Sequence, residues 1–180
     1  MSYCAYCLDS KAKQVHVDYH NNQYGFPVQD DNELFGRLLL EINQAGLSWE
    51  TVLNKQENFR VAYDQFNIKR IANYSEEDRA RLLSDPGIIR NKLKVNAAIH
   101  NAQQILQLTR EYGSFSQWLD QHHTLSLAEW TKLFKKTFKF VGGKIVHEFL
   151  MSIGYLPGAH DKNCPIFAVI EKTNPKWKEI

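Results

Sequence analysis

The chain has 180 residues, of which 43% are hydrophobic and 12% aromatic, and its formal net charge at pH 7 is +2. This composition excludes a disordered chain and predicts a single globular domain over residues 1–180 with a real hydrophobic core. The mild positive charge permits a nucleic-acid partner without requiring one, because a solvated surface of mixed charge gives the same balance.

The N-terminal residues MSYCAYCLDSKAKQ contain no apolar stretch typical of a secretory signal. No segment approaches the ~20 apolar residues of a membrane span. We therefore expect no membrane partner and a cytoplasmic location, where a reducing environment disfavours disulfides. The three cysteines then indicate a metal site first and buried free thiols second.

Residues 1–28 are polar and are predicted to be irregular, yet they are rich in tyrosine and contain Cys4, Cys7, His16 and His20. An irregular segment of this kind needs something to hold it to the rest of the fold.

From Asp30 onward the hydrophobic pattern is helical almost throughout. Asp30 or Asp31 can cap a helix with Leu34 and Leu38 on its inward face, and Gly46 ends it. No pair of alternating runs flanks a hairpin turn, so the predicted fold class is all-α. The later helices are expected to begin at Ser48, at Ser75 with a capping box, after the Asp85-Pro86-Gly87 turn, at Ser114 or Ser116, at Ser126, and at Gly142-Gly143.

Glu41 lies on the inward stripe of the first of these helices, because residues three and four apart stack on one face. One interpretation is a helix-end carboxylate that reaches solvent or meets an arginine. The other is a buried carboxylate held for a ligand, since burying this charge is costly without a cation or hydrogen-bond donors. Gly46 allows a sharp turn, so Trp49 can face the same pocket, where an aromatic face suits a flat or cationic ligand. Ordinary core packing is the alternative for Trp49.

Residues 75–110 have the pattern of a helix, an Asp-Pro-Gly turn and a second helix. Gly87 lies in the turn, and Arg90, Lys92 and Lys94 follow it. A glycine turn at a helix start offers backbone N–H groups to a phosphate, and flanking cations add attraction that is independent of sequence. The alternative is a plain helical hairpin with a solvated basic rim.

Metal-binding side chains lie near both ends of the chain. Two cysteines and two histidines suit a closed tetrahedral zinc site, which would pin the N-terminal segment to the C-terminal one. Spacing alone leaves open thiols that bind no metal and two ligand sets: Cys4, His20, His160 and Cys164, or Cys4, Cys7, His160 and Cys164.

Several stretches, taken in order, resemble the bacterial DNA-3-methyladenine glycosylase I family. They are Cys4, YHNNQYG at 19–25, QAGLSW at 44–49, GIIR at 87–90, FKFVG at 138–142, and His160 with Cys164. QAGLSW and FKFVG are the most specific of these. The resemblance implies a helix-hairpin-helix glycosylase fold with a structural zinc on Cys4, His20, His160 and Cys164, which leaves Cys7 outside the set.

The resemblance also implies how the base site is built. Glu41 would contact a base flipped out of the duplex, Tyr19 would assist it, and Trp49 would stack on it. Gly46 and Leu47 would approach the gap left in the DNA. In the lining of the same site, Tyr6 and Tyr24 stand where the family usually has tryptophan, and the segment between Trp118 and Trp130 is shorter than is typical.

The implied activity is base-excision repair, in which the N-glycosidic bond of N3-methyladenine is hydrolysed in alkylated duplex DNA. An N3-alkylated adenine is cationic and leaves as a neutral base, so a pocket with one carboxylate and stacked aromatics suits it. The QAGLSW block contains no lysine, so we expect no Schiff-base lyase step, and nothing aims Asp120 at the pocket. The alternatives are a different alkylated purine and a non-catalytic, zinc-stabilised module that binds damaged DNA.

Overall fold

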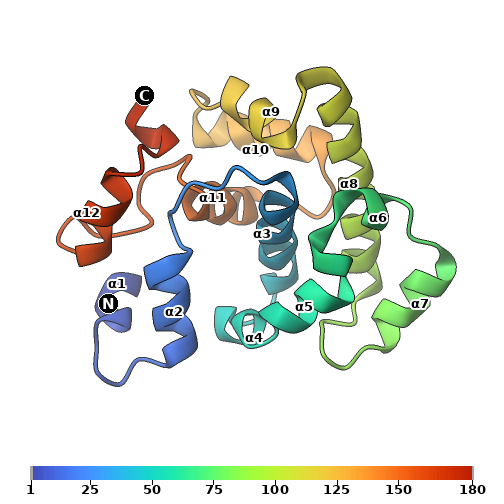
Figure 1. Ribbon diagram of the computed structural model, residues 1–180, viewed down its shortest axis with the longest axis horizontal. Helices are drawn as coiled ribbons and strands as arrows, with labels where there is room; N and C mark the ends of the chain where they lie inside the picture. Colours follow the sequence, from blue (N-terminus) through green and yellow to red (C-terminus); the bar gives the residue numbers. More distant parts are fainter. Residues whose placement is uncertain (1, 180) are drawn as a thin grey trace.

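The computed structural model describes residues 2–179, and within that range it is helical and contains no strand (Figure 1). The predicted all-α class is therefore confirmed for the described part of the chain. In chain order, the elements are α1 (Tyr3–Cys7), α2 (Gln14–Asn22), α3 (Asp31–Gln44), α4 (Trp49–Leu53), α5 (Gln56–Ala62), η1 (Asp64–Phe66), α6 (Ile68–Ala72), α7 (Glu76–Ser84), α8 (Lys92–Tyr112), α9 (Phe115–Gln121), α10 (Leu127–Thr137), α11 (Gly143–Ser152), α12 (Pro165–Glu171) and η2 (Lys176–Glu179).

Helix α3 lies at the centre of the molecule and packs against α4, α8, α9 and α11 (Figure 1). All its residues from Leu34 to Asn43 are buried, so the helix is enclosed by its neighbours. Asp30 caps α3, because its carboxylate accepts a hydrogen bond from the N–H of Glu33 at 2.8 Å. Asp31 instead accepts from the N–H groups of Phe115 and Ser116, both at 2.9 Å, and so ties the start of α9 to the start of α3.

Most helix starts lie where the capping residues predict. Ser48 caps α4 through the N–H of Thr51, and Ser75 forms the expected capping box with Asp78. Ser114, not Ser116, caps α9. The helix expected after Ser48 is divided into α4 and α5, which are separated by Asn54 and Lys55.

The N-terminal segment corrects one expectation, because most of residues 3–22 are helical rather than irregular. The buried side chains of α2 are His16, Tyr19 and His20. A helix whose inward face consists of histidine and tyrosine shows no hydrophobic stripe, so the pattern used to find the other helices misses it.

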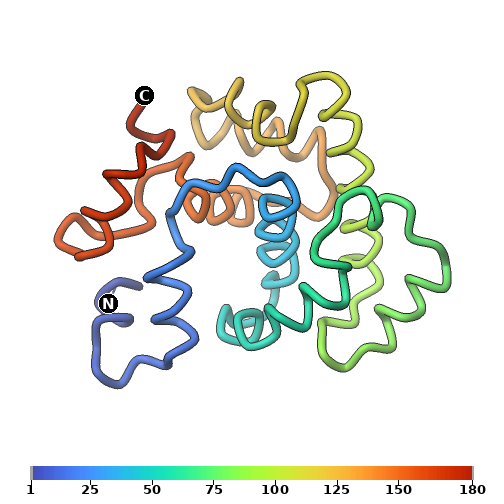
Figure 2. Tube along the Cα trace, viewed as in Figure 1, coloured from blue at the N-terminus to red at the C-terminus, as the bar shows by residue number. Residues whose placement is uncertain are grey.

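The N- and C-terminal segments lie on the same side of the molecule, with α12 next to α1 and α2 (Figures 1 and 2). The N–H of Gly25 donates to the carbonyl of Ser152 at 2.8 Å, which joins the end of α2 to the end of α11. The tail after Cys164, for which the sequence suggested nothing, forms α12 and η2, and Phe167 stacks on Trp177. Over residues 2–179, none of the helices combines the length and hydropathy needed to cross a bilayer.

Candidate base-binding pocket and metal site

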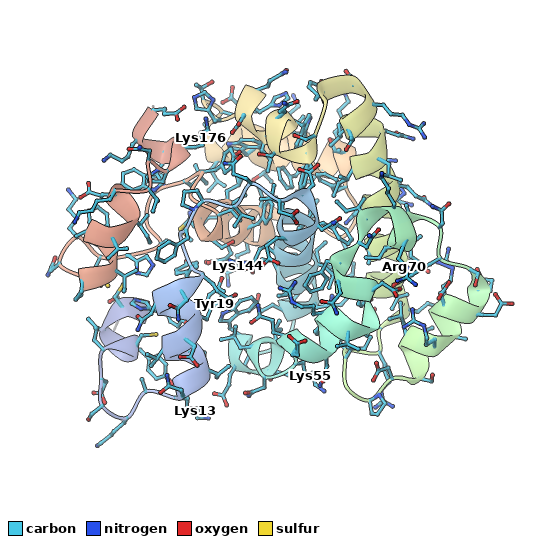
Figure 3. The ribbon with its side chains drawn as sticks, viewed as in Figure 1. Lys13, Tyr19, Lys55, Arg70, Lys144 and Lys176 are labelled. Carbon is cyan, nitrogen blue, oxygen red and sulfur yellow. The ribbon has the colours of Figure 1, made fainter. Side chains whose placement is uncertain are left out.

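A cavity of about 330 Å³ opens between α1, α2, α3, α4 and α11. Tyr19 of α2 and Lys144 of α11 lie near each other in the middle of the molecule in Figure 3, which marks the place of this cavity. The lining residues are Tyr3, Tyr19, Tyr24, Glu41, Gln44, Trp49, Lys144 and Glu148.

Glu41 contributes a buried carboxylate to this cavity, with 5% of the residue exposed. Burial, together with the nearby charge of Glu148, raises the pKa of this carboxyl to about 8, while Arg37 opposes the shift. No residue among 2–179 forms a hydrogen bond to the Glu41 carboxylate. The guanidinium of Arg37 donates instead to Glu33, at 3.1 Å, and to the Gln23 carbonyl, at 3.2 Å. The carboxylate therefore neither reaches bulk solvent nor forms an arginine pair.

Aromatic rings form the walls beside Glu41. The ring centroids of Tyr19 and Trp49 are 5.1 Å apart at an interplanar angle of 65°. The Tyr24 ring lies 5.5 Å from the Tyr19 ring, and its hydroxyl donates to Glu148 at 3.1 Å. Burial and the charge of Glu41 raise the pKa of Tyr19, so both hydroxyls stay neutral at ordinary pH. A planar ligand would meet two aromatic walls and one carboxyl here.

Tyr6 is not brought to this cavity. Its ring packs edge-on against His16, with centroids 5.3 Å apart, and stacks on Tyr3 at 6.4 Å. Tyr3, one turn earlier in α1, lines the cavity instead. Helix α1 has five residues, too few for a periodic pattern that would choose between its two tyrosines.

Lys144 and Glu148 are lining residues that the sequence did not indicate. They lie four apart on α11, and so share one helix face. The apolar pattern of this helix defines its core-facing side and says nothing about the partner of its polar side. Only the packing of α11 on α3 brings Glu148 to Glu41.

The turn between α3 and α4 is formed by Ala45, Gly46 and Leu47. Gly46 has φ +83°, a left-handed conformation, and a Cβ at this position would meet no atom within 4 Å. Glycine is therefore required here by backbone conformation and not by packing. Leu47 is 37% exposed at the tip of the turn, close to the mouth formed by Gln44 and Trp49.

The hairpin between α7 and α8 presents Arg90 and Lys92 as exposed side chains. Several of its backbone N–H groups are already used. Asp85 accepts from Gly87 at 2.7 Å, and Asn91 accepts from the N–H groups of Leu93 and Lys94 at the start of α8. The hairpin therefore offers exposed cations more than a set of free N–H groups.

Lys94 corrects the expectation that it contacts a phosphate. It is 4% exposed, and its ammonium donates to the carbonyls of Asn43, at 2.8 Å, and Ala45, at 2.7 Å. These carbonyls lie at the C-terminal end of α3, where a cation is also favoured by the helix dipole. The lysine thus joins the hairpin helix α8 to the turn that carries Gly46 and Leu47.

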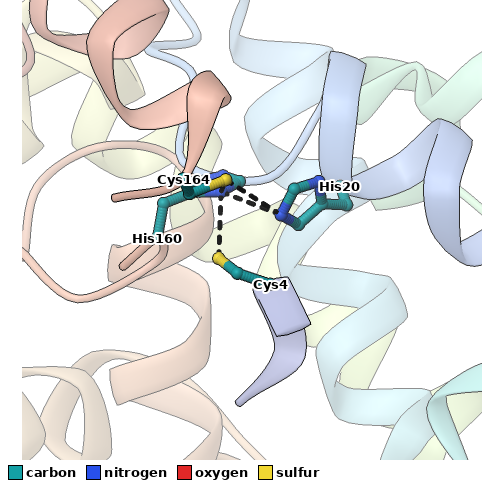
Figure 4. A group of neighbouring side chains, drawn as sticks. All are labelled: Cys4, His20, His160 and Cys164. Carbon is teal, nitrogen blue, oxygen red and sulfur yellow. Dashed lines mark hydrogen bonds between the residues drawn. The ribbon is translucent and has the colours of Figure 1, made fainter. Parts of the chain in front are cut away.

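The second cluster joins the two ends of the chain (Figure 4). One ligand atom from each of its four members lies within 4.8 Å of all the others, and all four residues are buried. His160 Nδ1 lies 3.1 Å from His20 Nε2 and 3.6 Å from Cys4 Sγ, and Cys164 Sγ lies 3.6 Å from His20 Nε2. The members are Cys4, His20, His160 and Cys164.

Outer contacts orient both histidines of this cluster. His160 Nε2 lies 2.8 Å from the carbonyl of Tyr24, and His20 Nδ1 lies 2.7 Å from Asn21 Oδ1. Cys7 is outside the group, and its thiol lies 3.7 Å from the carbonyl of His16. The four residues together could hold a metal ion, and the alternative set that includes Cys7 is not assembled.

Comparisons with known proteins agree with this geometry. A family model described as methyladenine glycosylase matches residues 9–167. DNA-3-methyladenine glycosylase 1 of Escherichia coli K12 is 36% identical over 159 residues, covering 78% of this chain and 85% of that protein. The DNA-3-methyladenine glycosylase of Haemophilus influenzae is 32% identical over 172 residues, covering 85% and 92%.

Solved structures give the same result. The 3-methyladenine DNA glycosylase I of Staphylococcus aureus superposes with a TM-score of 0.82 at 30% identity, over 92% of this chain and 97% of that one. The resemblance seen in the sequence motifs is thereby confirmed. The chain belongs to the methyladenine glycosylase family.

Proposed function

We propose that this protein is a monofunctional DNA glycosylase that hydrolyses the N-glycosidic bond of N3-methyladenine in alkylated duplex DNA. The observation that carries the proposal is the Glu41 carboxyl, which is buried in an aromatic-walled cavity where no described residue donates a hydrogen bond to it. Family membership and the names of the relatives support the substrate.

The charge of the substrate explains why one carboxylate suffices. N3-methyladenine is cationic while bonded to the sugar, and the N9–C1′ electron pair leaves with the base, which becomes neutral. Water then adds to C1′ and loses a proton. Glu41 needs to favour the cation over neutral adenine, a preference that we put at ~1–3 kcal/mol. Its raised pKa implies that an arriving cation displaces a proton from Glu41.

Each wall of the cavity has a role in this proposal. Trp49 stacks on the flipped base, and Tyr19 and Tyr24 line the cavity beside it. Gly46 and Leu47 lie at the tip of the turn, and we propose that the exposed Leu47 side chain enters the gap left in the stack. Tyr6 acts indirectly, by supporting Tyr3.

The hairpin would hold the DNA backbone. Exposed Arg90 and Lys92 flank the turn that contains Gly87, and phosphate contacts of this kind set register without reading sequence. Lys94 supports the same region from inside, through the carbonyls of Asn43 and Ala45.

We also propose that the four-residue cluster holds a structural zinc. Tetrahedral ligands at the usual Zn–S and Zn–N bond lengths lie about 3.3–3.8 Å apart. Three of the separations in the cluster, 3.6, 3.6 and 3.7 Å, lie in this range, a fourth is 3.1 Å, and all four ligand atoms lie within 4.8 Å of one another. Two thiolates and two imidazoles form a closed site, so the ion would cross-link the chain ends and take no part in the reaction.

Base release is the direct test of the proposal. The protein is incubated with methylated duplex DNA, and free 3-methyladenine is measured beside other N3- and N7-alkylated purines in the same DNA. Release of 3-methyladenine by the wild-type protein that falls sharply in Glu41→Gln supports the proposal. Affinity for abasic DNA with no release of any base would instead indicate the non-catalytic module. Borohydride treatment during turnover should trap no covalent adduct, although Lys144 lines the cavity.

A further inference from the structure

The base cavity is lined by a second carboxylate, Glu148. It projects from α11, which packs directly on α3. Its position is fixed by the Tyr24 hydroxyl, which donates to Glu148 Oε2 at 3.1 Å. Glu148 is partly exposed at the edge of the cavity, whereas Glu41 is buried at its base.

Glu41 and Glu148 line the same cavity, and the charge of Glu148 is the second cause, after burial, of the raised pKa of Glu41. When both carboxylates are ionised, the two like charges in one small cavity repel each other, and either a proton on Glu41 or a bound cation removes this cost. Among residues 2–179 neither carboxylate forms an ion pair, and Lys144, which lines the same cavity, is exposed. Arg37 is bonded to Glu33 and Gln23, and no ion pair forms between Lys144 and Glu148 within residues 2–179.

We propose that Glu148 is a specificity-determining residue, and that with Glu41 it restricts the cavity to purines that carry a fixed positive charge. The inference rests on the proposed function and extends it, because it assigns discrimination against neutral bases to a residue of α11. Tyr24 positions this carboxylate through its hydroxyl. A tyrosine in this place therefore supplies a hydrogen bond, in addition to the aromatic face.

Ligand binding tests the inference without DNA. The full-length protein is titrated with 3,9-dimethyladeninium, a fixed cation, and with 3-methyladenine at one alkaline pH where that base is neutral. Glu148→Gln should weaken binding of the cation by about 10- to 100-fold, the range of a charge-assisted contact. It should change the affinity for the neutral base by less than about 3-fold. Tyr24→Phe should weaken binding of the cation by a smaller factor, because the Glu148 carboxylate remains but loses the hydrogen bond that positions it.

Controls separate this effect from damage to the fold. Glu111 is exposed near the C-terminal end of α8 and does not line the cavity, so Glu111→Gln removes one negative charge at a distance. It should leave both affinities unchanged. Equal losses for the two ligands in Glu148→Gln, or no loss for either, would overturn the inference.

The release assay on methylated DNA distinguishes this inference from the proposed function. If the wild-type protein releases 3-methyladenine while Glu148→Gln keeps its preference for the fixed cation, the role of Glu148 fails and the proposed function stands. If the wild-type protein releases no base, the proposed function fails, whatever the titrations give.

Discussion

The metal cluster and the base cavity are both buried groups of polar side chains, but they differ in how completely they are enclosed. In the cluster, four ligand atoms converge to within 4.8 Å, and outer contacts fix both histidine rings. In the cavity, the Glu41 carboxyl faces about 330 Å³ of space, and no hydrogen bond from residues 2–179 reaches it. One group is shaped for a single small ion, and the other for a flat ligand.

This difference in enclosure indicates which kind of cation each group is suited to bind. Converging thiols and imidazoles at tetrahedral separations suit an ion that stays bound and contributes to folding. A single carboxyl whose pKa is raised to about 8 can remain protonated when the cavity is empty and lose that proton to a cationic ligand. With the proposed zinc bound, the first group would add to the stability of the fold, while the second is costly to ionise until its ligand arrives.

Loss of the metal ligands should have the largest effect. His20→Ala removes one of the four donors, and we expect it to reduce the free energy of unfolding by about 5 kcal/mol or more, because metal-binding energy is folding energy. Zinc content and thermal unfolding of the purified variant check this. An unchanged zinc stoichiometry in His20→Ala would reject the ligand set.

Glu41→Gln should stabilise the protein, with a gain that grows as the pH rises. The carboxyl has a pKa of about 8 when folded against 4.5 for an ordinary glutamate, so between these values the folded state holds a proton that the unfolded state releases. Wild-type stability therefore falls as the pH rises through this window, by at most about 5 kcal/mol. Thermal unfolding of both proteins from pH 5 to pH 8 measures the gain. A gain that is constant with pH would contradict this account.

The same substitution should sharply reduce base excision. Removing the one buried carboxyl of the cavity is expected to lower kcat/KM for 3-methyladenine release by about 100-fold, the upper range of a charge-assisted contact. Single-turnover kinetics on methylated DNA measure it, with Glu111→Gln as the control. Glu41→Gln is thus expected to raise stability and lower activity. His20→Ala, by contrast, is expected to lower stability and disrupt the metal site together.

Lys94→Met should have a smaller effect on stability, and it should loosen the contact between the start of α8 and the turn after α3. It leaves the carbonyls of Asn43 and Ala45 without their donor, and we expect a loss of about 2 kcal/mol in stability. Excision should fall while affinity for free 3-methyladenine changes little, because the lysine does not line the cavity. A parallel loss of free-base affinity would place Lys94 in base binding instead.

Cys7→Ser should have the smallest effect, below about 1 kcal/mol, because this thiol makes only a weak contact with the carbonyl of His16. Zinc content should not change, which makes this variant the matched control for His20→Ala. Loss of zinc in Cys7→Ser would instead favour the ligand set that includes Cys7.

The sequence was sufficient where local chemistry decides the structure. The Ser75 capping box and the Ser48 cap require only neighbouring residues, and both are present. The inward position of Glu41 follows from helical spacing with Leu34 and Leu38, and all three are buried. The Gly46 turn is likewise local, since it depends on one positive φ.

Features that depend on tertiary packing were missed. Helix α2 buries histidine and tyrosine, which do not read as a hydrophobic stripe. Glu148 reaches the cavity only because α11 packs on α3, and Lys94 is buried only because α8 passes the end of that same helix. Spacing along one helix does not indicate which neighbour its polar side will meet.

The Lys94 bridge has a consequence for how damaged bases are found. Since one ammonium holds the start of α8 to the last carbonyls of α3, the hairpin that we propose to hold the DNA backbone is tied directly to the turn beside the base cavity. A displacement of the hairpin relative to this turn would break both hydrogen bonds of Lys94. The bending and unstacking needed to present a nucleotide must then come from the DNA, and weakened base steps deform most easily.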